Sequence, residues 1–279
     1  MPTYAYRIVN VFAESPLAGN PLAVFEDARG IEPTTMQALA LQFNLSESTF
    51  ILPSTRATAH VRIFTPTFEM PFAGHPTLGT AHVVRALRDS GDAVTLEMQA
   101  GVIPVRASGD VWTLSANAPR HRAPAASRAE LAAMLGLALR DLADTPPLWV
   151  DTGSEQLVIP LVSVDAVNRA APHADLLHKH GSSGHRTLAY VFARDGDHVT
   201  CRFFFSKHGA VVEDPGTGSA CANLGGWLLA TGAPLPQRLT LDQGAAVGRP
   251  CRLGLAVATD GTIEVSGRVI ELGRGTLTF

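Results

Sequence analysis

The stretch that most constrains this fold is residues 213–220, Glu-Asp-Pro-Gly-Thr-Gly-Ser-Ala, because it links a predicted strand to a predicted helix through glycines. Residues 199–205 before it are rich in β-branched and aromatic side chains, which favours a buried strand. Residues 220–230 after it are small and apolar, which favours a packed helix. We expect this helix to begin near Thr217 and to be capped by Thr217 or Ser219.

The start of this helix is suited to bind an anion. Gly216 and Gly218 let backbone N–H groups converge on one point. A helix N-terminus favours negative charge, a carboxylate above all. Asp214 lies directly ahead of the turn. Taken alone, the same residues also describe an ordinary N-cap turn with a solvated aspartate, so the choice depends on evidence elsewhere in the chain.

That evidence is a second turn of the same kind, about 140 residues earlier. Residues 59–64 alternate as a half-buried strand, and residues 72–80, Phe-Ala-Gly-His-Pro-Thr-Leu-Gly-Thr, open an apolar helix that we expect to run to about residue 87. The two turns predict two similar domains that face each other. Two helix starts would then hold one small anionic substrate, with contacts from Gly74, Gly218, Ser219 and Ala220.

The rest of the chain indicates an α+β fold with few helices. Residues 33–43 carry a helix signature, with Pro33 at the first turn and an apolar face of Met36, Leu39, Ala40 and Phe43. Most other segments read as short strands.

The halves are joined by a stretch that reads as a linker. Residues 119–126 are rich in Pro, Ala and Arg. We therefore expect an N-terminal half of residues 1–118 and a C-terminal half of residues 127–279. A helix is expected over 127–139, and from its sequence alone this helix could belong to either half. Whether the last strand, residues 274–279, returns to the first half stays open.

Composition excludes several classes of function. The chain of 279 residues is 46% hydrophobic and 17% charged, which indicates a folded protein with a large core. A net charge of −3 and a pI near 6.4 argue against nucleic acid or an anionic membrane as partner. No secretory signal or membrane-spanning run is visible, and Cys201, Cys221 and Cys251 suit reduced thiols. We expect a soluble cytoplasmic protein.

The candidate acid/base residues are Glu47, His75, Asp214 and Ser219. Each has an ordinary alternative: Glu47 could be a solvated loop carboxylate, His75 a helix cap, Asp214 a partner of the helix dipole and Ser219 a cap. Their joint placement at paired turns favours an acid/base site.

Other kinds of site fit less well, and we expect no metal and no cofactor. His173, His178, His180 and His185 lie in a polar stretch without metal-ligand spacing. Neither glycine turn has the dinucleotide-binding pattern. The sequence around Ser219 lacks the final glycine of a nucleophile elbow.

Four motifs in this order resemble the phenazine-biosynthesis PhzF-like family, which belongs to the diaminopimelate epimerase and proline racemase fold. The resemblance covers nearly the whole chain, and the shared order makes it specific. The similar pieces are Gly-Asn-Pro-Leu-Ala-Val-Phe at 19–25, Asn-Leu-Ser-Glu-Ser-Thr-Phe at 44–50, Phe-Thr-Pro at 64–66 with Glu-Met-Pro-Phe-Ala-Gly-His-Pro-Thr-Leu-Gly at 69–79, and residues 213–220.

The resemblance implies two pseudo-symmetric domains, each a mostly antiparallel sheet wrapped around a central helix, with the active site in the cleft. It implies that Glu47 is the proton-transferring acid/base, and that His75, Asp214 and Ser219 complete the site. The best-known member isomerises a dihydro-hydroxyanthranilate without a cofactor, and members are commonly dimeric. The resemblance therefore implies a cofactor-independent isomerase of a small carboxylate and a homodimer.

The chain departs from the racemases and epimerases of this superfamily, which carry a cysteine at each facing turn. Ala73 and Pro215 stand at those positions, so we expect no two-thiol chemistry. Cys221 is expected to be a packing residue. A single Glu47 suits a different reaction, in which one group removes a proton and returns it elsewhere, and this role requires a raised pKa for Glu47.

Two other classes of function stay open at this stage. The chain could be a ligand-binding or regulatory protein that keeps the cleft without chemistry. It could also be a structural dimer with a vestigial site. Neither the identity of the carboxylate nor a role in phenazine synthesis follows from the sequence.

Overall fold

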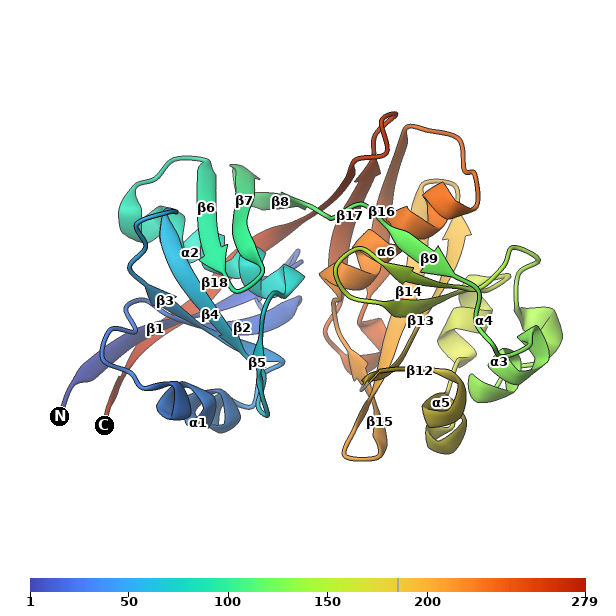
Figure 1. Cartoon of the computed structure of the whole chain (residues 1–279), viewed down its shortest axis with the longest axis horizontal. Helices are drawn as coiled ribbons and strands as arrows, with labels where there is room; N and C mark the ends of the chain where they lie inside the picture. The colour runs from blue at the N-terminus through green and yellow to red at the C-terminus, as the bar shows by residue number, and fades with distance from the viewer. Residues whose placement is uncertain (185) are drawn as a thin grey trace. The chain divides into compact units, whose positions relative to one another are not determined.

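In a computed structural model, which describes residues 1–184 and 186–279, the chain forms two compact units (Figure 1). The first contains residues 1–115 and 266–279, and the second contains residues 116–265. The question left open by the sequence is thereby answered, because the C-terminal segment belongs to the first unit. None of the helices in the described part of the chain is long and apolar enough to cross a membrane.

The first unit is built mainly from strands. Strand β1 pairs with β18 and β2, and β2 runs parallel to β3. Strand β3 pairs with β4, which runs parallel to β6, and β6, β7 and β8 follow as antiparallel neighbours. The elements are β1 (Thr3–Val11), β2 (Asn20–Phe25), α1 (Pro33–Phe43), β3 (Glu47–Leu52), β4 (Ala59–Phe64), β5 (Glu69–Met70), α2 (Gly74–Arg88), β6 (Ala93–Met98), β7 (Gly101–Ser108), β8 (Val111–Ser115) and β18 (Ile263–Thr278).

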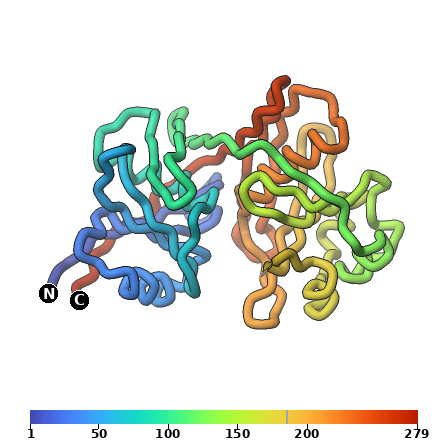
Figure 2. Tube along the Cα trace, viewed as in Figure 1, coloured from blue at the N-terminus to red at the C-terminus, as the bar shows by residue number. Residues whose placement is uncertain are grey.

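The two ends of the chain lie side by side in the first unit (Figure 2). Thr3 of β1 pairs with Thr278 of β18. Arg7 of β1, whose side chain is only 5% exposed, lies 2.6 Å from Glu26 and 2.9 Å from Glu271 of β18. The contact with Glu271 joins β1 to β18 through side chains. Breaking it would leave the buried guanidinium with one carboxylate fewer, which is costly for a buried charge.

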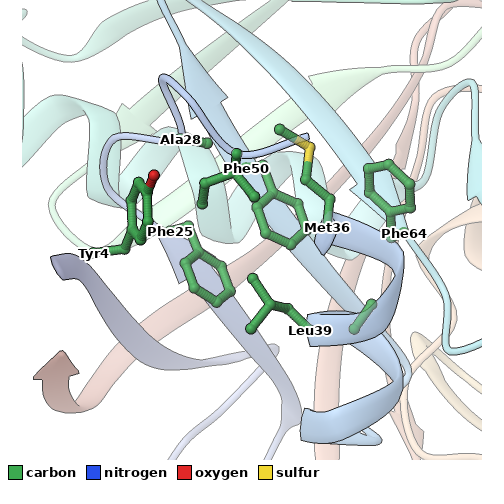
Figure 3. Close-up of a cluster of buried hydrophobic side chains, with 9 residues drawn as sticks. Tyr4, Phe25, Ala28, Met36, Leu39, Phe50 and Phe64 are labelled. Carbon is green, nitrogen blue, oxygen red and sulfur yellow. The ribbon is translucent and has the colours of Figure 1, made fainter. Parts of the chain in front are cut away.

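Helix α1 covers a cluster of aromatic residues on the sheet. The predicted helix over 33–43 is confirmed, and its expected apolar face packs on the strands. The rings of Phe25 and Phe50 stack with centroids 4.6 Å apart, and Phe64 meets Phe50 edge-on at 5.5 Å. Figure 3 shows Met36 and Leu39 of the helix among these rings.

Helix α2 is buried along most of its length and contacts β1, β2, β3, β6 and β8. Gly79 allows this close packing. A methyl group added there would lie 2.7 Å from Leu22 Cδ2 and 2.9 Å from Val11 Cγ2. Glycine in a helix interior costs up to about 1 kcal/mol relative to alanine. At this position the close contact of the helix with the strands offsets that cost.

We expect Gly79→Ala to destabilise the protein by about 1–3 kcal/mol. The methyl group overpacks the interface with β1 and β2, and this cost exceeds the free energy that alanine gains over glycine in helix propensity. Urea unfolding measures the difference. Gly273→Ala is the matched control, since a methyl group at Gly273 meets no atom within 4 Å. Equal stability of the two variants would contradict the overpacking argument.

The second unit is also rich in strands. Strands β9, β10 and β11 are antiparallel, β11 runs parallel to β13, and β13 pairs with β14. Strand β14 pairs with β15 and with β16, which pairs with β17. The elements are β9 (Arg120–Arg122), α3 (Arg128–Met134), η1 (Leu139–Asp141), β10 (Leu148–Asp151), β11 (Gln156–Pro160), α4 (Val164–Arg169), α5 (Ala174–His180), β12 (Ser182–Ser183), β13 (Arg186–Asp195), β14 (His198–Lys207), β15 (Ala210–Asp214), α6 (Gly218–Ala230), β16 (Gln237–Gln243), η2 (Ala245–Val247) and β17 (Cys251–Val257).

Two local predictions in this unit were wrong. The stretch 119–126, predicted as a linker, contains β9, which pairs with β10 although its side chains are exposed. The helix predicted over 127–139 ends at Met134, because the Leu137 amide donates to the Ala132 carbonyl and closes the helix end. Helix α6, by contrast, starts one residue after the predicted Thr217 and is buried almost throughout.

Candidate active site

Glu47 is placed by the pairing of β2 and β3. Helix α1 ends at Phe43, and Asn44 takes the left-handed conformation with φ of 50°, which turns the chain toward β3. Glu47 is the first residue of β3 and pairs with Leu22 in the parallel ladder. The starts of β2 and β3 therefore lie together, and the Glu47 side chain is 15% exposed there.

His75 meets Glu47 from the first turn of α2. Its side chain is 7% exposed, and its Nε2 atom lies 3.5 Å from Oε2 of Glu47. Asn20, the first residue of β2, places its amide nitrogen 3.5 Å from Nδ1 of the same ring. The structure thus brings two of the four predicted acid/base residues together within the first unit.

His75 is neutral at ordinary pH. Burial lowers the pKa of His75 to about 3, and a hydrogen bond to the Pro21 backbone opposes this shift only in part. The contact with Glu47 is therefore between a carboxyl group and an uncharged imidazole, and is not an ion pair.

The hydrogen on the imidazole can be assigned to Nδ1. Nε2 makes no hydrogen bond within the described part of the chain, so the bond to Pro21 uses Nδ1. Proline has no N–H, so its backbone can only accept, and Nδ1 must donate. On this assignment the Asn20 amide nitrogen, 3.5 Å from Nδ1, is a neighbour of the ring and not its hydrogen-bond donor. Nε2 then carries the lone pair that faces Glu47. A proton shared by the pair would be donated by the Glu47 carboxyl group and accepted by Nε2.

Asp214 is the last residue of β15 and lies beside the start of α6. The Thr217 hydroxyl donates to Oδ2 of Asp214. The Gln243 side chain donates to the Asp214 carbonyl at 2.8 Å and accepts from the Thr217 amide at 3.2 Å. Thr217 occupies the N-cap position without a capping side-chain bond, so the expected cap is absent because the hydroxyl serves Asp214 instead.

The neighbouring acid, Glu213, has a different role. Its carboxylate binds the Arg202 guanidinium at 2.7 Å, and this guanidinium also donates to the Ala170 carbonyl at 2.7 Å. These contacts anchor β15 to β14. Of the two consecutive acids, Asp214 alone is associated with the turn into α6.

Ser219 lies in the first turn of α6, partly exposed, and its hydroxyl accepts a hydrogen bond of 2.8 Å from the Gln156 side chain. The expectation that it caps α6 is not met, because this hydroxyl is bonded to Gln156. Gly218 is buried at the start of the helix. Ala220 is fully buried and its amide donates to the Thr217 carbonyl at 3.1 Å, so this amide is already used inside the helix.

Sequence reasoning missed several residues that hold these groups. Asn20 and Pro21 were quoted only as part of a motif, although they contact His75. Gln156 was expected only as part of a loop, residues 151–156, that shapes the substrate site, although it contacts Ser219. Gln243 was given no role, although it contacts the Asp214 turn. The glutamines have no local signal, because their partners lie far away in the sequence.

None of the three cysteines lies at the turn before α2 or at the turn before α6. Ala73 is the N-cap of α2, and Pro215 follows β15. Cys201, Cys221 and Cys251 are buried, and burial raises the pKa of all three thiols, that of Cys201 to about 12. None of them supplies a thiolate near neutral pH, so two-thiol racemase chemistry has no base here.

The described residues contain no group of three or more His, Cys, Asp or Glu side chains that could hold a metal ion. His178 and His180 lie in the last turn of α5, and His173 precedes that helix. His185, which belonged to the weighed metal alternative, lies outside the described residues.

Comparison with known proteins identifies the family. The model of the phenazine biosynthesis-like protein family matches residues 9–275. The chain belongs to this family. It is 40% identical to an uncharacterized isomerase of Pasteurella multocida, over 98% of this chain and 94% of that protein. It is 39% identical to the trans-2,3-dihydro-3-hydroxyanthranilate isomerase of Pseudomonas fluorescens, over 98% of this chain and 99% of that protein. This member of the phenazine biosynthesis-like family is an isomerase.

Solved structures show the same fold. A phenazine biosynthesis protein of the PhzF family from Bacillus anthracis has a TM-score of 0.87 at 24% identity, with all of both chains covered. A hydroxyproline epimerase from Agrobacterium vitis has a TM-score of 0.64 at 11% identity, over 99% of this chain and 92% of that chain. The fold seen here is thus shared with a PhzF-family protein and with a hydroxyproline epimerase.

Proposed function

We propose that this protein is a cofactor-independent isomerase that moves a proton and a double bond on a small carboxylate, with Glu47 as the acid/base. The observation that carries the proposal is the contact of 3.5 Å between Glu47 and a buried His75 whose pKa is lowered to about 3. A neutral imidazole can accept a hydrogen bond from a protonated carboxyl group, and it does not stabilise the carboxylate as a cation would. Glu47 is therefore suited to hold a proton and to release it again.

The proposed reaction needs one group on one face of the substrate. The Glu47 carboxylate removes a proton from carbon, and the electron pair of the broken C–H bond forms the new double bond. The electrons of the old double bond move to the far carbon, which takes the proton back from Glu47. No electron acceptor is consumed, and the atoms of substrate and product are the same.

Residues of the second unit are also proposed as substrate contacts. Asp214 supplies a carboxylate at the turn, and Ser219 and Gly218 supply a hydroxyl and a helix start suited to a substrate carboxylate. Gly74 is proposed as the corresponding contact at the start of α2. Ala220 is left out, because its side chain is fully buried and its amide is bonded.

We also propose that the two units are related halves, each a sheet wrapped around its buried helix. Before α2, Arg62 binds Glu69 at 2.6 Å and lies 5.1 Å from the centre of the Phe64 ring. Before α6, Arg202 makes the same pair of contacts with Glu213 and Phe204, at 2.7 Å and 4.7 Å. Repetition of a three-residue contact ahead of each buried helix supports a common origin of the halves.

The experiment that tests the function is solvent exchange. The protein is incubated in D2O with trans-2,3-dihydro-3-hydroxyanthranilate, the compound named for the Pseudomonas fluorescens relative, and with a panel of small unsaturated carboxylates. Mass spectrometry and NMR follow deuterium on carbon and the position of the double bond. We expect both to change with at least one compound. Absence of exchange and of double-bond movement with every compound would overturn the proposal.

A further inference from the structure

A chain of buried hydrogen bonds in the second unit ends at the Ser219 hydroxyl. It begins at Thr152, whose backbone N–H and hydroxyl lie 2.9 Å and 2.7 Å from Oδ1 of Asn223. A backbone N–H can only donate, so the Asn223 atom facing Thr152 is the carbonyl oxygen. The orientation of the Asn223 amide is thus fixed by the backbone.

The orientation of Gln156 follows from that of Asn223. The Asn223 Nδ2 atom donates to the Ser154 carbonyl at 2.8 Å and to Oε1 of Gln156 at 2.9 Å. The remaining Gln156 atom is therefore its NH2 group, which lies 2.8 Å from Ser219 Oγ. Because an amide NH2 can only donate, Ser219 Oγ is the acceptor and its own hydrogen points elsewhere.

We infer that Gln156 is a positioning residue that makes Ser219 a hydrogen-bond donor toward the substrate. The inference rests on the proposed function and adds to it a requirement on the substrate: the group that meets Ser219 must be an acceptor, as a carboxylate is. Gln156 does not itself touch the substrate on this assignment. It acts by occupying the acceptor side of the hydroxyl, so that the hydrogen is available to the ligand.

The burial of the chain explains why this orientation is stable. Gln156 and Asn223 are both 0% exposed, and each buried amide has partners on both its oxygen and its nitrogen. Reversing either amide would place two donors or two acceptors against each other without water to separate them, which is costly in a buried site. The network therefore holds the Ser219 hydroxyl in one state before any ligand binds.

Two substitutions at Gln156 separate polarity from shape. Gln156→Met keeps the length of the side chain and removes the donor to Ser219. Gln156→Glu keeps the shape and can accept from both Asn223 and Ser219, which turns the hydroxyl hydrogen inward. We expect the KM for the substrate found by solvent exchange to rise by about 10-fold with Met and by about 100-fold with Glu, with a smaller change in kcat, since hydrogen bonds to charged groups have effects of this size.

A double-mutant cycle with Ser219→Ala distinguishes positioning from a merely structural role. In the Ser219→Ala background, we expect Gln156→Met to change KM by less than twofold. An equal rise of KM in both backgrounds would overturn the inference. Urea unfolding of each variant shows whether the fold is kept. The KM values in the two backgrounds decide the inference.

Binding measurements separate this inference from the proposed function. Calorimetric titration with benzoate and anthranilate gives Kd values for the same set of variants. If the wild type binds these carboxylates but exchanges no hydrogen with any compound, the isomerase proposal fails, and the Kd ratios then decide the role of Gln156. If the wild type neither binds nor reacts with any carboxylate, both are overturned.

Discussion

Replacing Glu47 by Gln should reduce turnover of the identified substrate by at least ~10²–10⁴-fold, the contribution typical of general acid–base catalysis. Gln keeps the size of the side chain and its place beside His75, but it can neither remove a proton from carbon nor return one. Deuterium incorporation and movement of the double bond should be lost together, because one group is assigned to both steps. Initial rates in H2O and isotope content in D2O measure the two losses.

The matched control is Glu97→Gln in the same unit. Glu97 is also partly buried, with 23% of its side chain exposed, and it bonds to Ser54 and Arg56. It has no place in the proposed site, so this variant should keep wild-type turnover within about twofold, as surface substitutions usually do. Unchanged turnover in Glu47→Gln would remove Glu47 from the mechanism. Equal losses in the two variants would point to damage of the fold.

Helix α1 and the two helices that carry site residues could be predicted because their signals are local. Helix α1 was predicted to the residue, since Pro33 marks its first turn and its apolar spacing matches a helix. Helices α2 and α6 follow glycine-bearing turns, and their starts were placed within about two residues. The residue types at these turns, with the order of the motifs, also gave the family.

Strand β15 was missed, although a local signal for it exists. Lys207 pairs with Ala210 across the two-residue turn at His208 and Gly209, and both turn residues have positive φ. A two-residue turn of this kind joins hairpin strands, but histidine is less typical at its first position than Asn or Asp. The strand that leads into the 213–220 turn is therefore β15. The strand predicted at 199–205 corresponds to β14, which precedes β15 in the chain.

The contacts of the candidate site could not be predicted, because they depend on tertiary pairing. Glu47 meets His75 only because β2 and β3 run parallel and α2 begins beside their starts. Ser219 meets Gln156 across a sequence separation of 63 residues, through strand β11 packed on α6. The sequence shows which residues have acid, base or hydroxyl groups. The local sequence around each pair does not show which of them are in contact.

The protein should lose folding stability in acid because His75 is buried in its neutral form. The folded-state pKa of about 3 lies below the ordinary value of 6.5, so the unfolded chain binds this proton more tightly between these pH values. Stability from this group is complete above pH 6.5 and is lost as the pH falls toward 3. The loss should be about 2 kcal/mol at pH 5 and about 4 kcal/mol near pH 3.

The measurement is urea unfolding of the wild type and His75→Asn between pH 7.5 and pH 4.5. Asn does not titrate, and its amide can donate to the Pro21 carbonyl in place of Nδ1. The free energy of unfolding of the wild type should fall relative to that of the variant as the pH is lowered. Buried carboxylates with arginine partners also lose stability in acid, but they are present in both proteins and cancel in the difference.

The direction of the difference decides how His75 serves Glu47. If the wild type loses stability relative to His75→Asn on acidification, His75 is neutral in the folded protein, and its Nε2 can accept a hydrogen bond from Glu47 whenever Glu47 carries the proton. If the wild type instead gains stability relative to the variant, His75 is a cation paired with a Glu47 carboxylate. Glu47 would then be held in its charged form, and a neutral histidine could not be the group that lets it keep and release a proton. The same burial that makes His75 a suitable partner for an acid/base therefore makes the protein sensitive to acid.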